Sequence, residues 1–175
     1  IALLQGNGQN SAGLLVPERL ALSAEHLRYG ERELHGAVIG ASYDRGHWRL
    51  NLESQEAAGF ASWRVDSPDD PGEVLARFRR VNWPQTEPDL AKRMRQLDLA
   101  PQRLPAMDIQ IESLRIGDRD LGASALKASS RRNDGVWIWG LDELQMQIQG
   151  ARLVASGQWK ANNMEVELDL KIENA

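Results

Sequence analysis

The clearest pattern in the sequence is a strict alternation of apolar and polar residues near its C-terminal end. The run 164–172, "MEVELDLKI", places an apolar side chain at every second position and a charged one between each pair. Two earlier segments, 107–117 ("MDIQIESLRIG") and 143–159 ("ELQMQIQGARLVASGQW"), alternate in the same way. A period of two with a polar opposite side is typical of antiparallel strands that have one dry and one wet face.

The alternation in segment 107–117 changes phase once. The apolar residues at 107, 109 and 111 share one parity, whereas Leu114 and Ile116 share the other. A one-residue β-bulge near Ser113 would return all of them to the same face of a sheet. We therefore predict a bulged strand here.

The middle of the chain predicts one more strand and one helix. "GEVLARFRRVNWP" (72–84) places apolar residues on one face with arginines between them, and Pro84 ends the strand. Proline-rich joints, 66–72 and 84–89, flank it. The segment 86–100 has a capping residue, Thr86, followed by apolar residues at helical spacing, which predicts one short helix.

A short motif occurs twice, as "GERELHG" (30–36) and "GDRDLG" (117–122), 87 residues apart. Each copy follows an alternating strand and precedes a strand of small residues and a polar turn. After the turn comes a strand that we expect to end near Leu52 in the first copy and near Leu144 in the second, and then a strand closed by a tryptophan. We predict a single β domain over residues 1–175, built from repeat-like units at about 17–66 and 104–162 that are joined by 67–103.

The repeated motif is expected to be a hairpin tip. Gly30 and Gly117 supply backbone freedom, and the charged residues that follow keep the tip in water. Leu34 and Leu121 would start the return strands with an apolar side chain facing inward. "RNDG" (132–135) predicts another hairpin, because Asp-Gly favours the positive φ angles of a type I′ turn.

Composition limits the class of protein. The chain has 175 residues, of which 42% are hydrophobic and 26% are charged, so it is neither disordered nor a membrane span. Its net charge of −4 argues against non-specific nucleic-acid binding, and the lack of cysteine excludes thiolate metal sites. Because the sequence opens on Ile1 without a signal-like segment, we expect a piece of a longer protein whose anchor lies elsewhere.

Candidate chemistry is sparse. The histidines His26, His35 and His47 all lie in the first unit without metal-ligand spacing, so surface roles are expected, with no metal and no cofactor. The acids sit at turns among basic residues, as solvated strand ends do. Six tryptophans would suit stacking on sugars or bases, but their repeat-related positions (48 with 137, 63 with 159) favour an architectural role at the sheet rim.

The apolar face leaves two interpretations open. One is a filled sandwich core, which periodicity alone favours. The other is an open, curved sheet whose concave side receives apolar molecules such as acyl chains, which the scarcity of aromatic residues suits. The predicted lining of such a groove comprises Ile109, Ile111, Leu144, Met146, Ile148, Val166, Leu168 and Leu170.

The second unit resembles a known family. "LPAMDIQIESLRIGDRDLGASALKASS" followed by "VWIWGLDELQMQIQGARLVASGQW" is similar to the pattern "LPxLDxxxxxLRxGxRxLGxLxLxA … WxLxxLxLxxPxAxLxAxGxW" of the AsmA-like proteins of Gram-negative bacteria, within them the YhdP family. The family's Pro is Gly150 here. The resemblance covers residues 73–160 well and the first unit more weakly. The matching residues are Leu104, Pro105, Asp108, Leu114, Arg115, Gly117, Arg119, Leu121, Gly122, Ala128, Leu141, Leu144, Ala151, Leu153, Ala155, Gly157 and Trp159.

The resemblance implies a large protein held in the inner membrane by one helix, with a long periplasmic body. That body is an elongated β-sheet folded into an apolar groove (a β-taco), which would carry phospholipid between the inner and outer membranes. Expected partners are phospholipid acyl chains, neighbouring repeats of the same chain and membrane proteins of the envelope, and no nucleic acid.

With the resemblance added, the expected fold is mostly β: an elongated, curved, antiparallel sheet forming an open groove, with at most one short helix. No catalytic residue is assigned. Two alternatives remain: a non-enzymatic scaffold module of envelope assembly with a filled core, and a glycan-directed enzyme that would use the acids and tryptophans.

Overall fold

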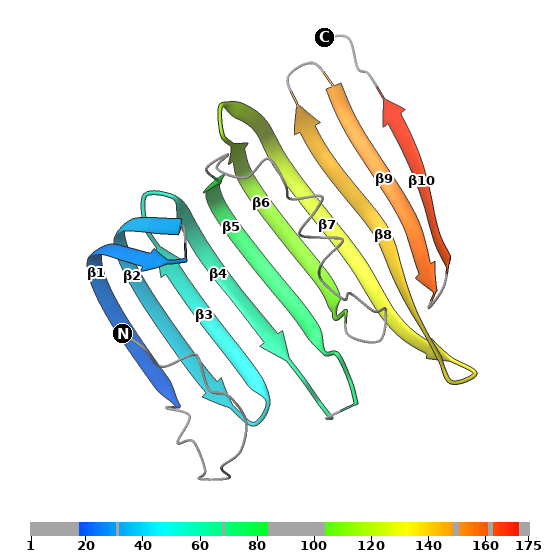
Figure 1. The fold of residues 1–175 in the computed structure, drawn as a ribbon, viewed down its shortest axis with the longest axis horizontal. Helices are drawn as coiled ribbons and strands as arrows, with labels where there is room; N and C mark the ends of the chain where they lie inside the picture. The colour runs from blue at the N-terminus through cyan, green and yellow to red at the C-terminus, as the bar shows by residue number, and fades with distance from the viewer. Residues whose placement is uncertain are drawn as a thin grey trace.

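A computed structural model describes residues 18–30, 32–67, 69–83, 104–148, 151–160 and 163–171. These residues form a single sheet of ten strands (Figure 1). The strands are β1 (Arg19–Tyr29), β2 (Arg32–Asp44), β3 (His47–Glu53), β4 (Ala57–Arg64), β5 (Glu73–Trp83), β6 (Ala106–Ile116), β7 (Arg119–Asn133), β8 (Val136–Ile148), β9 (Ala151–Lys160) and β10 (Asn163–Lys171). The predicted fold class, a mostly β open sheet, is confirmed. Strands β1–β4 fall within 17–66 and strands β6–β9 within 104–162, whereas the division into repeat units stays a prediction.

The strands lie in the sheet in chain order, each beside its sequence neighbour. Every neighbouring pair is antiparallel except β5 and β6, which run parallel. The expectation of a purely antiparallel sheet is therefore wrong at this one step. A parallel pair needs a long connection, because the chain must return to the edge where it started, and 84–105 supplies it. The predicted helix at 86–100 lies outside the described residues.

The strands predicted from alternation are present. β5 ends at Trp83 as expected from Pro84, and β6 and β10 cover the alternating runs. β3 ends beside Leu52 as predicted. β8 continues past Leu144 to Ile148, because the apolar alternation continues over those four residues and pairs with β9.

The predicted bulge in β6 is confirmed. The register with β7 shifts between Ile111 and Leu114, so two β6 residues face one β7 residue there. A comparable shift occurs in the β4–β5 register, between Ala58 and Gly59, and another in β8, between Leu141 and Leu144. Bulges bend the strands that carry them and increase their twist, which favours a curved sheet.

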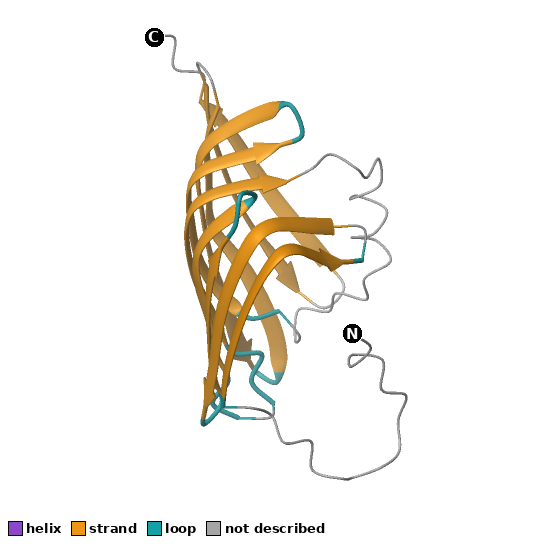
Figure 2. Cartoon of the chain, turned by 90° about the vertical axis from the view of Figure 1, so that its left-hand side faces the viewer, coloured by secondary structure: helices purple, strands orange, loops and turns teal. Residues whose placement is uncertain are grey.

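The sheet is curved and open. Seen from the side, it bends so that one face is concave, and the end of the β1–β2 hairpin folds over that face (Figure 2). The edge strands β1 and β10 do not pair with each other, so the sheet does not close.

The predicted turns are confirmed. The tips of the β1–β2 and β6–β7 hairpins begin with Gly30 (φ 62°) and Gly117 (φ 57°), and both loops have two residues. The "RNDG" turn has positive φ at both Asp134 (49°) and Gly135 (81°), as a type I′ turn requires.

The buried residues of the described chain are small. They are five alanines, Ala37, Ala58, Ala76, Ala128 and Ala155, one glycine, Gly140, and one serine, Ser54. Among the described residues, no large side chain is fully buried, and several leucines and tryptophans are more than a third exposed. The apolar face is thus not packed as a filled sandwich core in this part of the chain. No helix long and apolar enough to cross a membrane occurs in these residues.

Candidate functional site: the apolar concave face

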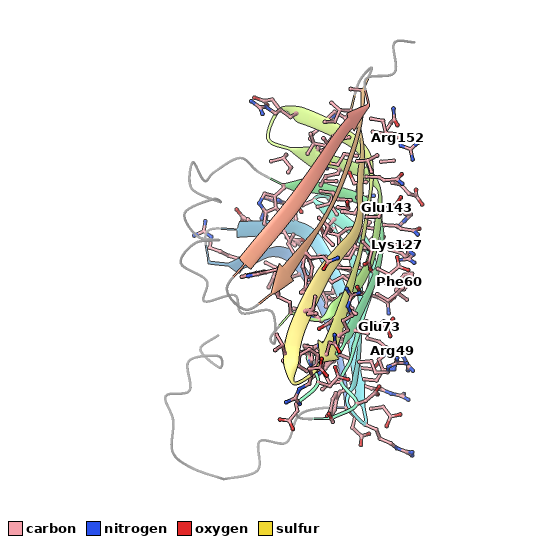
Figure 3. The ribbon with its side chains drawn as sticks, turned by 90° about the vertical axis from the view of Figure 1, so that its right-hand side faces the viewer. Arg49, Phe60, Glu73, Lys127, Glu143 and Arg152 are labelled. Carbon is pink, nitrogen blue, oxygen red and sulfur yellow. The ribbon has the colours of Figure 1, made fainter. Side chains whose placement is uncertain are left out.

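The two faces of the sheet differ in chemistry. Arg49, Glu73, Lys127, Glu143 and Arg152 project from the convex face, together with the exposed aromatic ring of Phe60 (Figure 3). Because side chains alternate along each strand, the residues between these positions project from the concave face. They are predominantly aliphatic and aromatic, so the convex face is polar and the concave face is apolar.

The concave face is hollowed where the β1–β2 hairpin folds over it. A cavity of about 380 Å³ lies there, a size within the roughly 300–1,000 Å³ range of ligand pockets. Residues from strands β1 to β6 line it: Leu27, Glu33, Leu34, Leu52, Glu56, Ala57, Phe78, Val81, Asn82, Trp83, Ile109 and Ile111. Nine of these twelve side chains are apolar, so this space suits hydrocarbon.

The predicted lining residues fall into three groups. Ile109 and Ile111 line the cavity. Leu144, Met146 and Ile148 lie on the same face at the other end of the sheet, where they pair across β9 with Ala155, Leu153 and Ala151. The backbones of Val166, Leu168 and Leu170 pair with Gly157, Ala155 and Leu153, but their side chains lie outside the described ones.

The predicted lining leaves out the residues on the other side of the cavity. Leu27 and Leu34 stand opposite each other in the β1–β2 hairpin and line the cavity from its tip. Phe78 and Val81 contribute from β5. The sequence predicts the apolar face of β5 and an inward-facing Leu34, but alternation does not encode the folding of the hairpin over β5, which is a long-range event.

Polar contacts between His35 and the β3–β4 turn hold the folded hairpin in place. The Glu56 carboxylate, in the β3–β4 turn, accepts a hydrogen bond from the His35 backbone N–H (2.9 Å), and its other oxygen lies 2.6 Å from His35 Nδ1. Partial burial by itself would raise the pKa of Glu56, but the hydrogen bonds from His35 outweigh it and lower that pKa below the ordinary value. Glu56 is therefore an ionised carboxylate, which can accept hydrogen bonds but cannot donate them.

Five of the six tryptophans lie towards the rim that carries the β2–β3 and β7–β8 turns, and Trp83 lies at the opposite rim, beside Gly117. Trp48 pairs across strands with Trp63 in the first unit, and Trp139 pairs with Trp159 in the second. The expected counterpart of Trp48, Trp137, is one pair closer to the turn, so the cross-strand contact is made by Trp139 instead.

Two of these indoles anchor the chain. Trp63 donates its ring N–H to the Pro71 carbonyl (3.2 Å), and Trp139 donates to the Pro105 carbonyl (3.0 Å). These carbonyls lie just before β5 and β6. The contacts support the architectural role proposed for the tryptophans over stacking on a sugar.

Three acids of the convex face are engaged in ion pairs. Arg77 contacts Asp108 (3.0 Å), Arg64 contacts Glu73 (2.8 Å), and Arg80 contacts Glu53 (2.8 Å). Such surface pairs contribute little stability, but they occupy the carboxylates. Their arrangement is that of a solvated surface.

Comparison with known families agrees with the resemblance seen in the second unit and extends it. The chain matches the family described as YhdP protein over residues 1–175. No curated protein and no solved structure matches it. The chain belongs to the YhdP family, an AsmA-like family of bacterial envelope proteins.

Proposed function

We propose that this chain is a section of a periplasmic lipid-transfer bridge that carries phospholipid between the inner and outer membranes. The longer protein would be anchored in the inner membrane. Acyl chains would travel along the concave face, and the headgroups would stay in water. The observation that carries the proposal is the apolar hollow of about 380 Å³ on a face with no filled core among the described residues.

The arrangement favours sliding over tight binding. Aliphatic side chains offer hydrocarbon contacts that are similar from one position to the next, because dispersion and hydrophobic contacts have no preferred direction. The polar lining residues of the cavity, Glu33, Glu56 and Asn82, are few. We therefore expect weak selection for chain length and for headgroup.

The rival scaffold function would use the same face as a filled core or as a docking surface. The exposure of large apolar side chains, including Leu50 (37%) and Trp63 (45%), favours the groove over a filled core. No reaction is assigned to the chain, since the proposed function needs only a continuous apolar lining.

A charged side chain on the concave face tests the proposal. In the complete protein, Met146→Glu should lower phospholipid transfer about ten-fold or more, because an ionised carboxylate in an apolar path costs several kcal/mol. The matched control is Gln145→Glu, one residue away on the convex face, which should transfer lipid normally. The measurement is the rate at which labelled phospholipid moves between the two membranes of cells that carry each variant.

Photo-crosslinking distinguishes the groove from the scaffold. A benzophenone amino acid at Ile111, in the cavity, should crosslink to phospholipid in cells, and one at Gln110, on the convex face, should not. Equal transfer by the two glutamate variants, together with no lipid adduct at position 111, would contradict the groove and favour the scaffold.

A further inference from the structure

The end of the β1–β2 hairpin brings together side chains that ligate metal ions. His26 and His35 are direct cross-strand partners, and Glu33 lies two residues before His35, on the same side of β2. Ligand atoms of these three side chains lie within 4.8 Å of one another. His26 Nδ1 is 3.3 Å from a Glu33 oxygen, and the two imidazole rings are 5.1 Å apart, edge to face.

We propose that His26, Glu33 and His35 form a binding site for a divalent transition-metal ion, with Zn²⁺ as the best match. Two imidazoles and one carboxylate are a zinc ligand set, and the fourth tetrahedral position is left for water. Imidazole ligands disfavour Ca²⁺ and Mg²⁺, which prefer oxygen. The site does not depend on the proposed lipid function.

The spacing of the ligands suits this ion. Zinc ligands at about 2.0–2.1 Å from the metal in a tetrahedron lie roughly 3.4 Å apart. The His26–Glu33 distance already has this value. The His26 and Glu33 side chains are 65% and 38% exposed, so they can rotate to close the remaining distance and the ion can enter from solvent.

Glu56 prepares His35 for the ion. The Glu56 carboxylate lies 2.6 Å from His35 Nδ1 and also accepts the His35 backbone N–H. A carboxylate can only accept, so we assign the ring proton to Nδ1, which leaves the Nε2 lone pair for the metal. A carboxylate behind a ligating histidine is a recurrent feature of zinc sites, where it fixes the orientation of the ring. Glu56 is thus a positioning residue.

The second hairpin of the chain provides an internal comparison. It has the same turn, but Ser113 and Gly122 stand at the positions that correspond to His26 and His35, and Arg115 pairs with Asp120 (3.7 Å) beside the tip. The turn does not require the histidine pair, so the pair is a separate feature of the first hairpin.

The test is metal binding by the complete protein, measured by equilibrium dialysis against Zn²⁺ and by the visible spectrum of Co²⁺. The wild type should bind one more Zn²⁺ per chain than His26→Ala or His35→Ala, and Co²⁺ should give a tetrahedral absorption band that both variants lose. His47→Ala is the matched control, because His47 lies outside the cluster, and it should keep the ion.

Two further variants keep the test decisive. Glu33→Gln retains the shape of the side chain and should also lose the ion, while hydrogen exchange shows that the β1–β2 strands still pair. Glu56→Gln should weaken Zn²⁺ binding about ten-fold or more without changing the number of ions bound. Equal Zn²⁺ binding by the wild type, His26→Ala and His35→Ala would overturn the proposal, as would a Co²⁺ band that persists in Glu33→Gln.

Discussion

The two hairpins that carry the Gly-acid-Arg-acid-Leu turn have the same tip but different surroundings. In the first, β3 ends opposite Val38, so the part of β2 before that residue pairs with β1 alone. In the second, β8 extends to Ile148 and lies alongside the start of β7. The first tip is therefore a two-stranded ribbon that folds over the concave face, whereas the second is backed by a third strand (Figure 1).

The difference shows that the local motif determines the turn and not its place in the fold. β3 has seven residues and β8 has thirteen, although they occupy the same position in their units. The shorter third strand frees the first tip to carry Leu27 and Leu34 onto the cavity. A change of strand length, with the turn unchanged, thus gives one hairpin a distinct role.

Replacing the glycine at the end of each motif should cause the largest loss of stability. Gly36 and Gly122 have nearly the same φ (59° and 61°), but an added Cβ at Gly122 would lie 2.1 Å from the Gln147 carbonyl oxygen and one at Gly36 would meet nothing within 4 Å. Gly122→Ala should cost about 3 kcal/mol or more, from strain and overlap together, and Gly36→Ala about 1 kcal/mol from strain alone. Hydrogen exchange of the backbone amides of β7 and β2 measures both, and equal losses would refute the contrast.

The second-largest effect is expected from removing the ring N–H of Trp63 or Trp139, and the loss of stability should differ between the two. Trp139→Phe removes a donor to the Pro105 carbonyl from a half-buried ring and should cost about 1 kcal/mol. Trp63→Phe removes the corresponding bond to Pro71 from a ring that is 45% exposed and should cost a few tenths of a kcal/mol. Exchange rates at the starts of β6 and β5 report these losses. A larger loss at Trp63 would mean that burial does not explain the difference.

The type I′ turns should show the smallest effect. Arg45 (φ 43°) and Asp134 (φ 49°) both occupy the left-handed region, which Asp tolerates better than Arg. Arg45→Asn should therefore stabilise the β2–β3 hairpin by about 0.5 kcal/mol, and Asp134→Arg should destabilise the β7–β8 hairpin by a similar amount. Thermal unfolding measures both. A change of the same sign in the two variants would disagree with the φ argument.

Sequence alone predicts the parts of this fold that depend on near neighbours. Alternation predicts the strands and the shift of register after Ile111, and the glycines predict the tips, because each of these depends on a few adjacent residues. The parallel step between β5 and β6 was not predicted, since it depends on where a long connection delivers the chain. The same holds for the site: Ile109 and Ile111 follow from alternation, whereas Leu27 and Leu34 become lining residues only when a ribbon folds across four strands.

The histidine cluster escaped prediction for a related reason. His26 and His35 lack any helical or loop spacing of metal ligands, and only the two-residue turn at Gly30 places them opposite each other. Counting residues outward from that turn would have paired them. Glu56 comes from another hairpin, and no pattern in the sequence connects it to His35.

The single parallel step has a consequence for how a long groove of this kind is ordered. If every neighbouring pair were antiparallel, β6 would run opposite to β1. The glycine-acid turn at the end of β6 would then lie at the opposite rim of the sheet from the turn at the end of β1. Because β6 runs parallel to β5, it points the same way as β1. Both glycine-acid turns therefore lie at one rim of the sheet, and the paired tryptophans lie towards the other. In both units the two rims therefore differ in chemistry, which gives the concave face two distinguishable sides for any molecule that approaches it from outside.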